Sequence, residues 1–151
     1  MTRKTLILVA TLGSLALMLG ALGFQYLGGL PPCKLCYWQR YPHIAAIAIG
    51  GLALATGLRA LPWLGALATL ATAGVGLYHT GVERGWWDGP STCTSGSIDG
   101  LSTDALLDQI MGAPLIRCDE VAWQLLSLSM ASWNMLVSLA LCAVWIAAAR
   151  R

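Results

Sequence analysis

The chain has 151 residues, of which 57% are hydrophobic and only 11% are charged, and its formal net charge is +2. So little polar surface cannot solvate a water-soluble globule of this size, which indicates a protein of the lipid bilayer. We expect the bilayer to be one of its partners and expect no nucleic-acid partner.

Four continuous apolar stretches follow one another along the chain, at residues 5–27, 41–58, 61–80 and 131–149. A helix needs roughly 20 apolar residues to cross a bilayer, whereas a barrel strand would alternate between apolar and polar positions. The first stretch follows Arg3 and Lys4 and exceeds the apolar core of a cleaved secretory signal, so we expect a retained anchor. The sequence predicts an all-α integral membrane four-helix bundle, with residues 1–151 as a single domain.

Two connections on one side of this bundle are long, at residues 28–40 and 81–130, and the second contains all seven acidic residues. Five basic residues gather on the opposite side: Arg3, Lys4, Arg59, Arg150 and Arg151. Basic residues favour the cytoplasmic side, but four others lie in the long loops, so the bias is slight. The position of the cysteines supports the same orientation, with cytoplasmic termini and periplasmic loops.

Inside the second loop, Leu101, Ala105, Leu106 and Ile110 recur at helical spacing after a possible Ser102 cap. This pattern predicts a short amphipathic helix that lies in the membrane interface. Small residues fill the second and third apolar stretches and predict close approach of those helices.

Four of the five cysteines lie in the two long loops, namely Cys33 and Cys36 in the first and Cys93 and Cys118 in the second. Two pairs on the side opposite the basic residues indicate an oxidising compartment, the bacterial periplasm. Cys142 falls within the last apolar stretch, where an unpaired thiol usually serves as a small core residue.

Cys33 and Cys36 form a Cys-x-x-Cys motif, whose short ring stabilises a fold poorly and suits disulfide exchange better. The attacking sulfur of such a pair must be a thiolate, which a cation or a helix N-terminus favours, and Arg40 follows Cys36 by four residues. A structural bond and a zinc site are the alternatives. Zinc would require four reduced thiolates, and no histidine lies at a useful ligand spacing, so we expect no metal.

Cys93 and Cys118 are 25 positions apart, which by itself fits a structural disulfide nearly as well as a redox pair. The second pair favours a relay, because two dithiol sites can pass electrons by sulfur exchange. A relay needs a terminal acceptor. Since the sequence offers no flavin or nicotinamide fold, a lipid-soluble acceptor from the bilayer is the simplest candidate.

Residues 32–42 read PCKLCYWQRYP and resemble the first periplasmic loop of the DsbB family of quinone-dependent thiol oxidases. Residues 78–87, YHTGVERGWW, and residues 89–93, GPSTC, are similar to the second loop of that family. Residues 117–119 and 130–134 resemble its return to the last helix. The order of the cysteines, the loop sizes and Arg40 after the motif make the resemblance specific along essentially the whole chain.

The resemblance implies a protein of the bacterial inner membrane that reoxidises a DsbA-like periplasmic dithiol protein. Cys93 would accept attack from that partner, and Cys118 would be its intramolecular mate. Cys33 would exchange with Cys118, while Cys36 would face a quinone of the membrane pool, ubiquinone or menaquinone. Arg40 would hold the quinone and favour the thiolate.

Two alternatives remain open. The VKOR family also places two cysteine pairs on a helical bundle, but its Cys-x-x-Cys follows the loop pair in the chain. A four-span scaffold with structural loop disulfides would leave Arg40 unexplained. For His43, His79 and Asn134 we expect packing or interhelical hydrogen bonding, with proton transfer by the histidines as the alternative.

Overall fold

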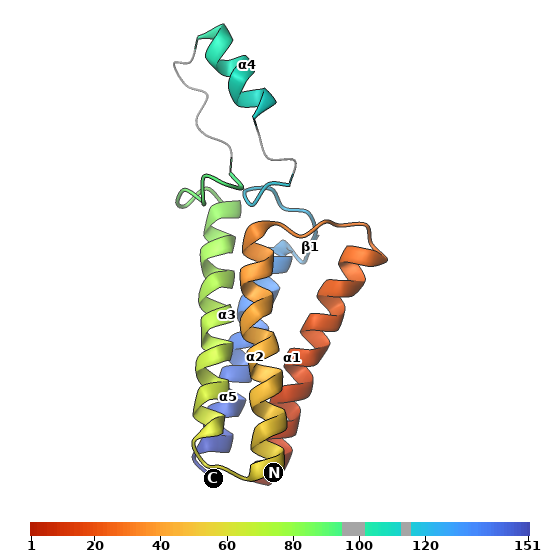
Figure 1. The fold of residues 1–151 in the computed structure, drawn as a ribbon, viewed down its shortest axis with the longest axis vertical. Helices are drawn as coiled ribbons and strands as arrows, with labels where there is room; N and C mark the ends of the chain where they lie inside the picture. Colours follow the sequence, from red (N-terminus) through yellow and green to blue (C-terminus); the bar gives the residue numbers. More distant parts are fainter. Residues whose placement is uncertain (95–101, 113–115) are drawn as a thin grey trace.

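The structure is a computed structural model that describes residues 1–94, 102–112 and 116–151. Its long elements are the helices α1 (Arg3–Tyr26), α2 (Lys34–Thr56), α3 (Leu61–Glu83) and α5 (Met130–Ala149). Figure 1 shows them as an elongated bundle, in which α3 packs against α2 and α5, and α1 packs against the same two helices. The chain is mostly helical, as predicted.

Three of these helices, α1, α3 and α5, are long and apolar enough to cross a membrane. Their outer faces expose large leucines, such as Leu12 and Leu19 on α1 and Leu67 and Leu70 on α3. A contiguous apolar surface of this kind is stable in lipid and costly in water. Helix α2 is as long as α3, but its first turns carry polar and charged side chains, and its crossing stays a prediction.

Helix α2 begins at Lys34, so the prediction of a loop from 28 to 40 and a helix from Tyr41 is wrong at this boundary. The Cys33 side chain caps the helix by accepting a hydrogen bond from the Cys36 backbone N–H at 3.2 Å. This cap satisfies a donor that the first turn otherwise leaves unpaired. Pro42 lies inside the helix, although proline usually marks a helix boundary. The other long helices begin and end within three residues of the predicted stretches.

Both termini lie at one end of the bundle, together with the turn between α2 and α3 (Figure 1). The Arg3 guanidinium donates to the backbone carbonyls of Gly57 at 3.0 Å and Leu58 at 2.7 Å, and Arg151 donates to the carbonyl of Met1. The predicted grouping of basic residues at one end, away from the cysteine loops, is therefore present.

Close helix packing depends on glycines at two contacts. A Cβ atom at Gly65 would lie 2.6 Å from ring atoms of Trp145, which is fully buried between α3 and α5. A Cβ atom at Gly50 would collide with the side chain of Thr11 in α1. These contacts confirm that small residues allow the helices to approach closely.

The second loop contains α4 (Thr103–Met111), which Ser102 caps by accepting from the Ala105 backbone N–H at 3.3 Å. The predicted short helix is confirmed there, although Leu101 lies outside the described residues. Figure 1 shows α4 beyond the loop end of the bundle, and its place in the membrane interface stays a prediction.

A two-stranded hairpin, β1 (Gln124–Leu125) and β2 (Leu128–Ser129), leads directly into α5. The all-α prediction missed it. Its turn residues Leu126 and Ser127 have φ angles of 52° and 61°. Such turns normally carry asparagine or glycine, so this sequence gives no hairpin signature.

Candidate functional site

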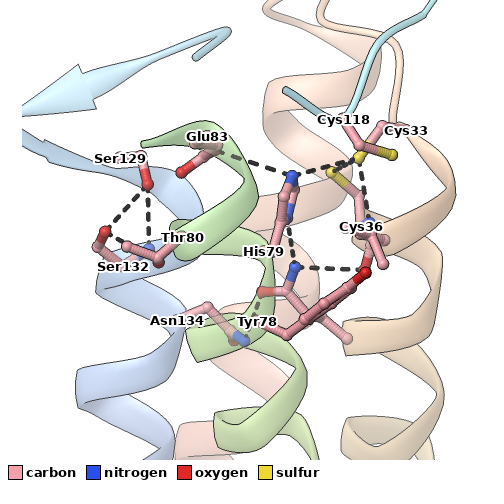
Figure 2. A network of polar contacts seen from close by, with 12 residues as sticks. Cys33, Cys36, Tyr78, His79, Thr80, Glu83, Cys118, Ser129, Ser132 and Asn134 are labelled. Carbon is pink, nitrogen blue, oxygen red and sulfur yellow. Dashed lines mark hydrogen bonds and ion pairs between the residues drawn. The ribbon is translucent and has the colours of Figure 1, made fainter. Parts of the chain in front are cut away.

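The four loop cysteines, which are distant in the sequence, meet at the bundle end opposite the termini. Cys33, Cys93 and Cys118 are buried in one cluster with Leu35 and Val82, and Cys36 packs against that cluster. Figure 2 shows Cys118 beside Cys33 above the first turn of α2. The fold therefore places the two predicted pairs in contact range of each other.

The two pairs differ in their bonding. Cys93 and Cys118 form a disulfide with a Cα–Cα distance of 5.3 Å. The sulfurs of Cys33 and Cys36 lie 2.8 Å apart without a disulfide between them. The structure thus contains a disulfide in the second-loop pair, as the resemblance implied, and none between Cys33 and Cys36.

Local backbone contacts hold the loop pair in place. The Cys93 N–H donates to the Pro90 carbonyl at 2.9 Å, and the Cys118 N–H donates to the Cys93 carbonyl at 2.6 Å. The Lys34 ammonium donates to the Thr92 hydroxyl at 3.0 Å and so connects the start of α2 to the segment that carries Cys93. The first loop and the second loop are thereby joined at the cysteines.

Within the Cys-x-x-Cys motif the two thiols are not equivalent. The hydrogen bond with the Cys36 side chain, followed by burial, raises the pKa of the Cys33 thiol well above its ordinary range. Cys33 is buried, whereas Cys36 is only partly buried. Of the two thiols, Cys36 is therefore the one that loses its proton more readily.

A cavity of about 560 Å³ opens beside Cys36, between α1, α2 and α5. Helix α2 contributes Cys36, Gln39, Arg40 and His43, which share one helical face because they are spaced by three, four and seven residues. Apolar and aromatic side chains form much of the remaining wall: Leu17, Met18, Phe24, Ile116, Val121, Trp123 and Met130. Volume and lining match a site for a small, largely apolar ligand.

Arg40 lines this cavity and is anchored to α1. Its guanidinium donates to the Gln25 side-chain oxygen at 2.5 Å and to the Ala21 carbonyl at 3.3 Å, and it stacks over the Tyr37 ring at 5.4 Å. A guanidinium has five N–H donors, so further donors remain for a ligand oxygen. Because α2 begins at Lys34, Arg40 lies one helical turn beyond Cys36.

His79 from α3 reaches the cysteine cluster, which its sequence position did not indicate. Its Nε2 lies 3.6 Å from the Cys33 sulfur and 3.8 Å from a carboxylate oxygen of Glu83, and the ring also hydrogen-bonds to the Cys118 backbone. Its Nδ1 lies 2.8 Å from the side-chain nitrogen of Gln39. One imidazole thus contacts both cysteine pairs.

Cys33, Cys36 and His79 form a possible metal-ligand set, since their ligand atoms lie within 4.8 Å of one another. Sequence spacing gave no histidine ligand for these cysteines, but the fold supplies His79 from another helix, so the spacing does not exclude a histidine ligand. Gln39 donates to Nδ1, so the neutral ring carries its proton on Nε2 and meets the sulfur as a donor. A protonated nitrogen does not ligate a metal, and the absence of a resident metal stays a prediction.

Asn134 and His43 take part in interhelical hydrogen bonds, as predicted. Asn134 in α5 donates to the Gln39 side chain at 2.8 Å and to the Thr72 hydroxyl at 3.1 Å, and its oxygen lies 3.0 Å from His43 Nε2. Cys142 is a buried free thiol, as predicted, and donates weakly to a backbone carbonyl.

Sequence reasoning assigned no role to Gln25, Gln39, Thr72 or Glu83. Each is a polar residue within or beside an apolar stretch, and polar residues inside membrane helices commonly face a partner or a functional cavity. That signal could have singled them out, but their partners come from other helices and depend on the packing.

A mostly helical protein with membrane-spanning segments and two clustered cysteine pairs belongs to the class of membrane thiol-disulfide proteins. The profile of the family described as Disulfide bond formation protein DsbB matches residues 3–148. The chain therefore belongs to the DsbB family, and the predicted resemblance is confirmed. Membership gives the chain a role as a disulfide oxidoreductase in disulfide bond formation.

Several relatives named Disulfide bond formation protein B match most of the chain. That of Methylococcus capsulatus is 32% identical over 91% of this chain and 88% of its own length. That of Verminephrobacter eiseniae is 33% identical over 89% and 79%. That of Albidiferax ferrireducens is 29% identical over 93% and 87%. No solved structure matches the chain.

Proposed function

We propose that the protein is a quinone-dependent thiol oxidase, which reoxidises a DsbA-like periplasmic dithiol protein and passes the electrons to the membrane quinone pool. The observation that carries the proposal is the contact of two cysteine pairs, one of which borders an apolar cavity lined by Arg40. The first pair can receive electrons from the second and deliver them to a ligand in that cavity.

Electrons enter through the loop disulfide. A thiolate of the partner attacks the Cys93 sulfur, the Cys93–Cys118 bond breaks, and Cys118 leaves as a thiolate. Cys93 is only 2% exposed, so this attack requires the loop to open at Cys93. The closed arrangement, in which Cys118 and Cys33 are buried in one cluster, suits the next step, which is exchange between these two residues.

Exchange between the pairs starts from an oxidised Cys33–Cys36 bond. The Cys118 thiolate attacks Cys33, and Cys36 leaves as a thiolate. The second thiol of the partner then releases Cys93 from the mixed disulfide, and Cys93 attacks Cys118 and frees Cys33. The partner leaves oxidised, the loop disulfide is restored, and both electrons reside on Cys33 and Cys36.

The cavity fits a quinone ring and part of its tail, because it is largely apolar and places a permanent cation, Arg40, beside Cys36. A quinone, when bound, supplies a two-electron acceptor stronger than DsbA, whose potential is about −120 mV. Cys36 would face the ring, Arg40 would donate to an oxygen, and re-forming the Cys33–Cys36 bond would release the two thiol protons. Ubiquinone and menaquinone share this chemistry.

For the membrane arrangement we propose one domain of four spans in the bacterial inner membrane. The grouping of Arg3, Arg151 and both termini at one end supports a cytoplasmic location there. The cysteine end would face the periplasm, with α4 at the interface.

The test mixes reduced DsbA-like protein, the purified chain and ubiquinone, and follows thiol loss and quinol formation together. We expect one quinol for each disulfide formed in the partner, with no turnover when ubiquinone is omitted. A four-span scaffold with structural disulfides would give no turnover.

A further inference from the structure

Four side chains at the cysteine end have the types and the spacing of zinc ligands, namely those of Cys33, Cys36, His79 and Glu83. Tetrahedral zinc holds its sulfur, nitrogen and oxygen ligands about 3.4–3.8 Å from one another. His79 Nε2 lies 3.6 Å from the Cys33 sulfur and 3.8 Å from a Glu83 oxygen (Figure 2). The sulfurs of Cys33 and Cys36, at 2.8 Å, would have to separate by about 1 Å.

A metal ion in this position would interfere with the redox chemistry. Metals bind cysteine as the thiolate, so an ion shared by Cys33 and Cys36 would occupy both sulfurs and block the disulfide between them. All four side chains belong to residues that line the cavity beside Cys36, which is the route by which an ion could reach them. The reduced pair therefore needs a feature that disfavours metal binding.

The group behind the imidazole of His79 provides such a feature. A histidine that binds a metal through one ring nitrogen normally donates the hydrogen of the other nitrogen to a carboxylate, a backbone carbonyl or water. Here the group at that position is a donor, because the Gln39 side-chain nitrogen lies 2.8 Å from His79 Nδ1. Nδ1 must accept, so the neutral ring carries its hydrogen on Nε2, the atom nearest to Cys33 and Glu83.

The Gln39 amide cannot turn over, because its neighbours fix both of its ends. Its nitrogen lies 3.2 Å from the Leu35 carbonyl oxygen, which can only accept. Its oxygen accepts from the Asn134 nitrogen at 2.8 Å. That nitrogen also donates to the Thr72 hydroxyl at 3.1 Å, whose own hydrogen goes to the Gln39 backbone carbonyl at 2.9 Å. A turned amide would place oxygen against oxygen at Leu35 and nitrogen against nitrogen at Asn134.

We propose that Gln39 is a positioning residue, which acts through His79 to keep the reduced Cys33–Cys36 pair free of metal ions. The amide holds the ring as a hydrogen-bond donor toward Cys33, so an ion meets two thiols and no imidazole lone pair. The reduced thiols can then re-form their disulfide without competition from a bound ion. The inference goes beyond the proposed function, since it concerns the reduced cysteines and does not depend on the electron acceptor.

One substitution should reverse the arrangement. Gln39→Glu keeps the length of the side chain and the acceptor for Asn134, but it replaces the donor at His79 by an oxygen. The ring should then donate from Nδ1 to the new carboxylate and present the Nε2 lone pair to the sulfurs, as zinc-binding histidines do. Gln39→Glu combined with His79→Ala is the control without a ring. Gln25→Glu is the matched control for charge, because Gln25 contacts Arg40 and not His79.

The experiment titrates the reduced full chain in detergent with Co²⁺, follows the cobalt–thiolate charge-transfer absorption and obtains the zinc dissociation constant by competition. Every protein carries Cys93→Ser and Cys118→Ser, so that the loop pair adds no thiols. We expect Gln39→Glu to bind zinc about 10- to 100-fold more tightly than the chain with Gln39, the usual effect of a residue that orients a metal ligand. Neither control should show this gain.

Equal zinc affinity of the folded proteins with and without Gln39→Glu overturns the inference. A gain that survives His79→Ala, or that Gln25→Glu reproduces, overturns it as well, because added charge would then explain the binding. None of these results bears on thiol oxidation by a quinone, so the proposed function is tested separately.

A measurement on the unmodified chain covers the case in which a variant does not fold. Nitrogen NMR of the reduced chain with isotope-labelled histidine reports which ring nitrogen carries the hydrogen. The chain has two histidines, and His43→Gln identifies the signals of His79 by removing the others. We expect a hydrogen on Nε2 of His79 and none on Nδ1. A neutral ring with its hydrogen on Nδ1 overturns the inference.

Discussion

The imidazole of His79 lies against the sulfur of Cys33, with Nε2 3.6 Å from Sγ, although 46 positions separate the two residues. Gln39 fixes the ring from the other side, so the face toward the sulfur carries the N–H. A donor at this position stabilises negative charge on Cys33 when that sulfur is displaced during exchange. The same ring also hydrogen-bonds to the Cys118 backbone, so one imidazole contacts both cysteine pairs.

Alkylation should therefore distinguish the two thiols of the Cys-x-x-Cys motif. Because the pKa of Cys33 is raised, its thiol stays protonated at neutral pH, and its reactivity should increase only as the pH rises above the ordinary thiol range. We expect iodoacetamide at pH 7 to modify Cys36 at least about tenfold faster than Cys33. Peptide mass spectrometry after short reaction times measures the order, and first labelling at Cys33 would contradict it.

The direction of electron entry can be tested by trapping the partner. Cys118→Ser leaves Cys93 as a thiol, so this variant is mixed with the oxidised partner. The Cys93 thiolate attacks the partner's disulfide, the second sulfur of the partner leaves as a thiolate, and a covalent complex that Cys118 cannot resolve should accumulate on non-reducing gels. Cys93→Ser should give no such complex. Cys142→Ser is the control, because this buried thiol lies in the other core cluster and should behave as the unmodified chain. A complex that forms equally well without Cys93 would assign the partner to another cysteine.

Much of this architecture could be predicted because apolar stretches of membrane length and cysteine order are properties of the sequence alone. The start of α2 could not, because it depends on capping by the Cys33 side chain and on a helix that continues through Pro42. The hairpin before α5 was missed because Leu126 and Ser127 are not residues that favour positive φ. The position of His79 was missed since only packing of α3 against α2 brings it to Cys33.

Packing at the other end of the bundle gives a stability prediction. Gly65→Ala would place a methyl group 2.6 Å from the Trp145 ring, and overpacking of this kind costs about 1–3 kcal/mol of the free energy of unfolding. Gly74→Ala is the matched control on α3, because its Cβ would meet nothing within 4 Å. We expect a lower melting temperature for Gly65→Ala in detergent, and for Gly74→Ala an unchanged or slightly higher one. If Gly65→Ala and Gly74→Ala had equal melting temperatures, the Trp145 ring would make room for the added methyl group without loss of stability.

Arg40 provides the sharpest test of the cavity. Arg40→Ala removes the cation from the cavity wall that also carries Cys36, so the apparent Michaelis constant for ubiquinone should rise about tenfold or more, with little change in partner binding. Arg40→Lys should restore only part of this loss, because an ammonium supplies charge without the planar fork that holds Gln25 and a ligand oxygen together.

The competing role for Arg40 is mechanical, since its guanidinium also ties α2 to α1 through Gln25 and the Ala21 carbonyl. Gln25→Ala removes one of these two hydrogen bonds and keeps the charge of Arg40, so it separates the two roles. If the cation acts on the quinone, Gln25→Ala should change the Michaelis constant by no more than about threefold, because the hydrogen bond that it removes is with Arg40 and not with the ligand. If Arg40 only anchors α1, both alanine variants should have a lower melting temperature. Their quinone kinetics per folded molecule should equal those of the unmodified chain. Quinol formation against ubiquinone concentration for the four proteins, normalised to folded protein, decides between them, and superimposable curves would remove Arg40 from the site.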